Sequence, residues 1–197
     1  MAAMDPAVVT DTSSDRAAPS PNATLLLVFA AGAAVAVFFG VYAHVHDPTG
    51  ESTLTLFFTG TLNLKVWFTT VAVFFAIVQI VTALRIYGKV KVPKQMPKWL
   101  GDVHRLAGTV AFLFTLPVAF HCLWSLGYQT GDTRVAVHSF LGCAFFGVFT
   151  VKVLGVRIHR LPGWVLPVVG STLFATLVLL WATSSLWFFQ NVDFPGV

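Results

Sequence analysis

Apolar residues in this chain come in long uninterrupted runs, and short polar segments separate the runs. A helix needs about 20 apolar residues to cross the hydrocarbon core of a bilayer. Five runs reach that length, at residues 24–44, 66–84, 103–126, 136–156 and 164–188. They are continuously apolar and do not alternate, which excludes the strands of a membrane barrel. We therefore predict an all-α polytopic membrane protein with five transmembrane helices in a bundle.

The composition supports a membrane protein and divides the chain into three parts. Of the 197 residues, 56% are apolar and 10% are charged, whereas about a quarter of a soluble domain is charged. Residues 1–22 are rich in Ala, Ser, Thr, Pro and Asp, and we expect a disordered N-terminal tail there. Residues 23–190 should form the five-helix transmembrane domain, and residues 191–197 a short external tail.

The charged residues predict how the chain is oriented in the membrane. Between the second and third runs there are six basic residues and one acidic residue, Asp102; the basic ones are Arg85, Lys89, Lys91, Lys94, Lys98 and Arg105. Basic loops stay in the cytoplasm. We expect a multi-pass protein of the inner (cell) membrane, with a cytoplasmic N-terminus and an external C-terminus. Basic clusters placed between spans favour this explanation of the net charge over a nucleic-acid partner.

The histidines are the residues with the clearest chemistry, because four of them match in depth on the third and fourth runs. His121 and His138 lie at the outer ends of these runs, and His104 and His159 at the inner ends. An imidazole in a membrane is costly unless it is hydrogen-bonded or ligated. Two imidazoles at one depth suit the two axial positions of a haem iron. We predict one or two haem b groups with these four histidines as iron ligands.

Alternatives to this ligand set remain open. His44 and His46, at the end of the first run, could replace one of the four histidines. A tetrahedral zinc site would need further ligands, and Cys122 points about 100° away from its neighbour His121 on a helix. Haem is therefore favoured over zinc.

At the start of the third and of the fourth run, a glycine follows a histidine after four residues. Gly108 follows His104 and Gly142 follows His138, so each pair lies on one helical face. A glycine there leaves room for a flat macrocycle, although close packing of helices through small residues is the alternative. Arg105, beside His104, is the candidate partner for a haem propionate on the inner side. Arg134 could play the same part for an outer haem.

These residues resemble a known family. The chain has His-Arg-x-x-Gly opening the third run at His104, a histidine closing it, and His-Ser-x-x-Gly opening the fourth run at His138. Over roughly residues 63–188 this pattern is similar to the small transmembrane cytochromes b, which include ascorbate-reducible cytochromes b and ferric-reductase-type haem domains. The resemblance implies two b haems, one toward each face, that pass electrons across the membrane. The histidine spacings are longer here than in ferric-reductase domains, and the second run has no histidine.

The expected function is electron transfer through bis-histidine haem, by the chain alone or as a membrane subunit of an oxidoreductase. The expected partners are the lipid bilayer, a quinol or a soluble redox carrier, and redox partner subunits. A haem-free helical anchor subunit and a small transporter are the alternatives. Among the other polar residues in the runs, Gln79 should form an interhelical hydrogen bond, and Lys152 should extend to the headgroups. Thr183 should bond to carbonyl groups of its own helix.

Overall fold

The computed structural model describes residues 20–51, 54–92, 94–158 and 161–192. Within these ranges the regular structure is entirely helical, and its five long helices are α1 (Pro21–Val45), α2 (Thr61–Ile86), α3 (Leu100–His121), α4 (Thr133–Arg157) and α5 (Val165–Trp181). Two of them continue into π-helical turns: α3 into η1 (Cys122–Leu126), and α5 into η2 (Ala182–Leu186) and then α6 (Trp187–Asn191). The five spans, with their extensions, are long and apolar enough to cross a membrane. The predicted all-α, five-helix membrane bundle is confirmed.

Two of the helices, α1 and α4, begin before their apolar runs, and a polar residue caps each of them. The side chain of Ser20 accepts a hydrogen bond of 3.2 Å from the backbone N–H of Ala23, so α1 begins at Pro21, inside the predicted tail. The side chain of Asp132 accepts one of 2.9 Å from the N–H of Val135 at the start of α4. Such caps satisfy backbone groups that a helix end leaves free. Hydropathy alone therefore sets the spans too short.

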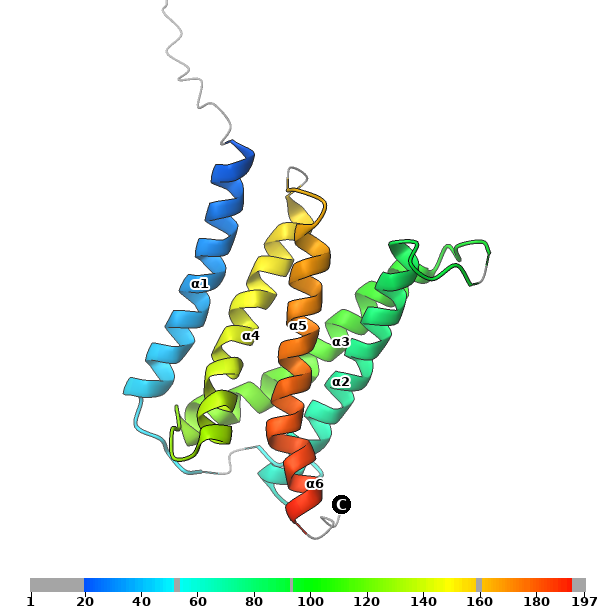
Figure 1. The fold of residues 1–197 in the computed structure, drawn as a ribbon. Coiled ribbons are helices and arrows are strands. Elements are labelled where there is room, and N and C mark those ends of the chain that lie inside the picture. Colours follow the sequence, from blue (N-terminus) through cyan, green and yellow to red (C-terminus); the bar gives the residue numbers. More distant parts are fainter. Residues whose placement is uncertain (1–19, 52–53, 93, 159–160, 193–197) are drawn as a thin grey trace, which may run out of the picture.

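The helices form two groups (Figure 1). α2 packs along α3, α4 packs against both α1 and α5, and α2 also contacts α5. We call the end with η1, η2 and the start of α4 the His138 end, and the opposite end, with the start of α3, the His104 end. Toward the His104 end the α2–α3 pair leans away from α4 and α5 (Figure 1). Consecutive helices α3 and α4 thus belong to different groups.

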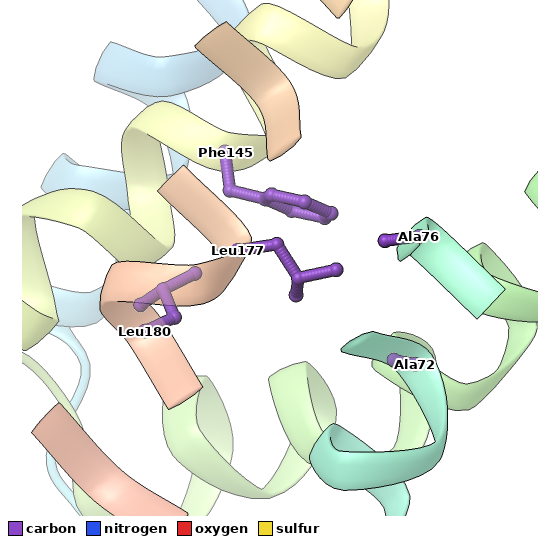
Figure 2. Packing of buried hydrophobic residues seen from close by; sticks show 5 residues of the cluster. All are labelled: Ala72, Ala76, Phe145, Leu177 and Leu180. Atoms are coloured by element: carbon purple, nitrogen blue, oxygen red, sulfur yellow. The ribbon is translucent and has the colours of Figure 1, made fainter. Parts of the chain in front are cut away.

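The core lies where α2, α4 and α5 meet. Ala72 and Ala76 of α2 face Phe145 of α4 and Leu177 and Leu180 of α5 (Figure 2), and all five are buried. The small alanines let the larger side chains of the other two helices approach α2. This packing holds the two helix groups together, and the candidate site described next lies beside it.

Candidate functional site

A cavity of about 350 Å³ lies at the His138 end, between α3 and α4. α1, α2, α5, η1, η2 and α6 also contribute to its walls, and most of the residues that line it are apolar. Its polar lining includes Lys65, Thr69, Thr115, Gln129, Arg134, His138, Ser139 and Thr183. Small-molecule and cofactor sites have this character: a concave apolar space of about 300–1,000 Å³ with a few polar groups. The cavity is therefore the candidate functional site.

His138 lines the cavity, and Thr183 holds its ring. The Nδ1 atom of His138 lies 2.9 Å from the hydroxyl oxygen of Thr183, which is also 2.8 Å from the carbonyl oxygen of Leu179. A hydroxyl has one proton and can both donate and accept. When Thr183 donates its proton to Leu179, it accepts the Nδ1–H of His138. The Nε2 atom then carries the lone pair, which is the form of imidazole that binds a metal.

Gly142, one turn after His138, lines the same cavity. A Cβ atom at this position would meet no heavy atom within 4 Å. Gly142 is therefore not required for helix packing in the described part of the chain. The space beside it and beside the imidazole of His138 is open to a flat ligand.

Two cations line the cavity as well. Arg134 is held in place: it donates a hydrogen bond of 2.7 Å to the carbonyl of Thr183, and its guanidinium lies 4.1 Å from the ring centroid of Trp187. Lys65 lines the wall contributed by α2. The carboxylate of Asp132 lies 3.9 Å from the guanidinium of Arg134 and compensates part of its charge. Lys65 and Arg134 nevertheless give a largely apolar space two cationic groups that would suit carboxylate groups of a ligand.

His121 shares the depth of His138 but not its cavity. It lies at the end of α3, is only 6% exposed, and its Nδ1 atom has no hydrogen-bond partner among the described residues. From α3 and η1, Ala119 and Cys122 reach the cavity instead. His138 is the histidine that lines the cavity within the described ranges. The sequence matched the two histidines in depth, but the faces of the helices do not bring both into one space.

The imidazole of His104 has the same arrangement as that of His138. Its Nδ1 atom lies 2.8 Å from the hydroxyl oxygen of Thr82, which is 2.7 Å from the carbonyl oxygen of Val78 in its own helix. His104 and His138, which open the third and fourth predicted spans, are thus each held by a threonine of a neighbouring helix. His159, the predicted partner of His104 at the inner ends of the runs, lies outside the described residues.

The face of Gly108 is taken by packing. A Cβ atom there would lie 2.9 Å from Nε2 of Gln79, whose side chain also donates a hydrogen bond to the carbonyl of His104. The amide oxygen of Gln79 accepts a bond of 2.9 Å from the ammonium group of Lys152. Gly108 therefore allows close packing of helices, which was the alternative to leaving room for a macrocycle. The predicted interhelical bond of Gln79 is confirmed, whereas the expectation that Lys152 extends to the headgroups is wrong.

The remaining candidates lie away from the cavity. The side chain of Arg105 is exposed and pairs with Asp102. His44 is exposed and lines a separate groove between α1 and α4. His46 stacks between Tyr42 and Trp124, and its Nε2 atom lies 3.2 Å from the carbonyl oxygen of Trp124. Neither His44 nor His46 lines the cavity with His138.

Sequence reasoning missed the threonines that hold the imidazoles. Thr183 does bond to the carbonyl of Leu179 in its own helix, as predicted, but it also holds His138. Thr82 was not singled out. The available signal was a hydroxyl in an apolar run, at the depth of a histidine on another run.

No three His, Cys, Asp or Glu residues converge on a metal-sized site in the part of the chain that the structure describes. The imidazole of His138, held at Nδ1 beside the open face of Gly142, has the chemistry to hold a planar cofactor that brings its own metal.

Comparison with known proteins identifies a family. Residues 25–196 match the model of DUF6529, a family of unknown function, so the chain belongs to that family. No curated protein and no solved structure matches the chain.

Proposed function

We propose that this member of DUF6529 is an integral-membrane b-type cytochrome that holds haem b at the His138 end and relays electrons. One observation carries the proposal. Inside a cavity of about 350 Å³, Thr183 holds His138 at Nδ1, beside the open face of Gly142. An imidazole held at one nitrogen, with an apolar space next to it, is a common way to hold an iron porphyrin.

The chain's own residues have distinct parts in this proposal. His138 would ligate the iron through Nε2, and Thr183 would fix the ring and its tautomer. Gly142 would leave the macrocycle room against α4, and Lys65 and Arg134 would pair with propionate carboxylates. The apolar walls would keep water out. A bound haem would supply a one-electron ferric–ferrous couple.

His121 is the proposed second axial ligand. Its buried Nδ1 atom lacks a partner among the described residues, and a buried polar atom in that state requires an explanation. Because Cys122 reaches the cavity instead, the end of α3 would have to turn by about 100°, the angle between consecutive helical residues. Without that turn, iron bound to His138 would be five-coordinate, and the spin state distinguishes the two outcomes.

We propose one haem per chain. The second predicted position, near His104, has the side chain of Gln79 against the face of Gly108. A single haem near one membrane face must exchange electrons with further molecules, which we take to be a quinol or a soluble redox carrier, and redox partner subunits. The basic loops support an inner-membrane protein with a cytoplasmic N-terminus and an external C-terminus.

The test is the haem content of the purified full chain, measured as the pyridine haemochrome. We expect a Soret band, a dithionite-induced α band and about one haem per polypeptide. His138→Ala should remove the haem. His44→Ala is the matched control, because His44 lines a separate groove, and it should keep the haem.

Two results would overturn the proposal. One is purified chain without haem after expression with a full haem supply, which would favour a haem-free anchor subunit or a small transporter. The other is full haem content in His138→Ala. If haem binds, a change from low-spin to high-spin spectra in His121→Ala would assign the second ligand, and an unchanged spectrum would exclude His121.

A further inference from the structure

The described residues between α2 and α3, 87–92 and 94–99, lie outside the helical bundle at the His104 end (Figure 1). The four lysines of this segment are all exposed, at Lys89, Lys91, Lys94 and Lys98. The segment belongs to neither the cavity nor the proposed haem site. Any role it has must therefore be separate from haem binding.

Apolar side chains alternate with these lysines and are also exposed. Val92 is 80% exposed, Met96 58% and Trp99 59%. Lysine and tryptophan side by side are typical of the interface between headgroups and acyl chains, where the ring and the aliphatic stem enter the apolar layer and the charge stays outside. A solvent-exposed loop without a partner would not be expected to present so many apolar groups together.

The positive charge of the segment is not compensated within the described part of the chain. No described carboxylate forms an ion pair with any of the four lysines, and Asp102, the acidic residue nearest in sequence, pairs with Arg105. Four cations close together attract an anionic surface, at about 1 kcal/mol for each lysine near an anionic membrane. The four charges are therefore available to an anionic surface.

The backbone holds the segment close to the end of α2. Gly88 has φ +70°, and the N–H groups of Lys89 and Val90 both bond to the carbonyl of Leu84, at 2.9 and 3.2 Å. This left-handed turn closes the helix. Because α2 and α3 are both long enough to cross the membrane, the segment between them starts and ends at the membrane surface.

The structure assigns to residues 87–92 and 94–99 a binding surface for anionic phospholipid headgroups of the surrounding leaflet. The lysines bind the phosphates, and Val92, Met96 and Trp99 enter the layer below them. The apolar groups between the lysines, and the attachment to two spans, favour lipid over an acidic soluble protein. The assignment is independent of haem binding.

The test uses the full chain in nanodiscs that contain brominated lipids, which quench nearby tryptophan. The contribution of Trp99 is the difference between the parent chain and Trp99→Phe. We expect brominated phosphatidylglycerol, present as a minor component in phosphatidylcholine, to quench Trp99 about twofold more than the same fraction of brominated phosphatidylcholine. The preference should disappear when all four lysines are replaced by Gln and persist when they are replaced by Arg.

Two outcomes would overturn the assignment: equal quenching by both lipids in the parent chain, or an unchanged preference in the four-Gln variant. A second measurement does not depend on fluorescence. Native mass spectrometry of the detergent-purified chain should show fewer retained anionic lipids in the four-Gln variant than in the four-Arg variant. Equal lipid retention, in variants with equal helical content, would exclude the loop as the binding surface.

Discussion

Thr183 lies 2.9 Å from Nδ1 of His138 and 2.8 Å from the carbonyl oxygen of Leu179. The hydroxyl thus links the imidazole of α4 to the backbone of the last span. Thr82 and His104 repeat the relationship between α2 and α3, at 2.8 Å. In both places a hydroxyl of a neighbouring helix holds an imidazole at Nδ1 and so fixes the orientation of the ring.

Replacing Thr183 should weaken haem binding without unfolding the chain. In Thr183→Val the imidazole of His138 loses the acceptor for its Nδ1–H, and loss of such a supporting hydrogen bond typically costs about 10–100-fold in metal affinity or activity. We expect a comparable loss of haem affinity in titrations of the haem-depleted protein. Thr183→Ser should restore much of it. Ser184→Ala is the matched control, since Ser184 bonds to the carbonyl of Leu180, and an equal loss in that variant would contradict the prediction.

A substitution at Gly142 distinguishes a role of this glycine in cofactor binding from a role in helix packing. Because a Cβ atom there meets no heavy atom within 4 Å, Gly142→Leu should fold and insert normally. Its side chain should occupy the space beside His138 and reduce haem loading by about tenfold or more, as filling a site that fits its ligand costs at least 1–2 kcal/mol. The readouts are haem content and thermal stability of the haem-depleted chain. A variant with full haem content would show that the macrocycle does not lie against this face.

The five spans were predictable from the sequence because a bilayer requires long apolar runs, and such runs are visible without knowing their neighbours. The ends of the spans were less predictable. α1 begins at Pro21 because Ser20 caps it, and hydropathy does not detect a cap. The depth of each histidine followed from its position along a span. The positions of the spans and the depths of the histidines depend only on residues close together in the sequence.

The cavity was not predictable, because it depends on which face of each helix meets which neighbour. His121 and Cys122 are consecutive, yet Cys122 reaches the cavity. Gly108 and Gly142 occupy the same motif, yet the side chain of Gln79 fills the space beside Gly108 and nothing fills it beside Gly142. Thr183 is 45 residues from His138. Contacts between distant segments determine these differences, and a single sequence does not display them.

The contact between α1 and α4 should tolerate no side chain at Gly147. A Cβ atom there would lie 2.6 Å from the carbonyl oxygen of Gly32 and 2.9 Å from Cβ of Ala36. Because one of these neighbours is backbone, the helices themselves must move apart. We expect Gly147→Val to lower the free energy of unfolding by about 1–3 kcal/mol. Unfolding in mixed micelles measures it, and Gly170→Ala, where a Cβ meets nothing within 4 Å, should have no comparable cost.

The hydrogen bond between Lys152 and Gln79 should behave as a coupled pair. The ammonium group of Lys152 donates to the amide oxygen of Gln79 at 2.9 Å, and a cation inside a membrane needs such a partner. Gln79→Leu removes the acceptor and leaves the charge of Lys152, so we expect the free energy of unfolding to fall by about 1–2 kcal/mol. Lys152→Met removes the charge itself, and in that background Gln79→Leu should cost less.

A double-mutant cycle on unfolding free energies measures the coupling between these two side chains. The bond from Gln79 to the carbonyl of His104 is lost in both backgrounds and therefore cancels. We expect the coupling energy to be about 0.6 kcal/mol and at most about 1.7 kcal/mol, as is typical of interhelical hydrogen bonds in membranes. Strict additivity would mean that Lys152 finds an equivalent partner when Gln79 is gone. The polar contact between α2 and α4 would then make no net contribution to the stability of the bundle.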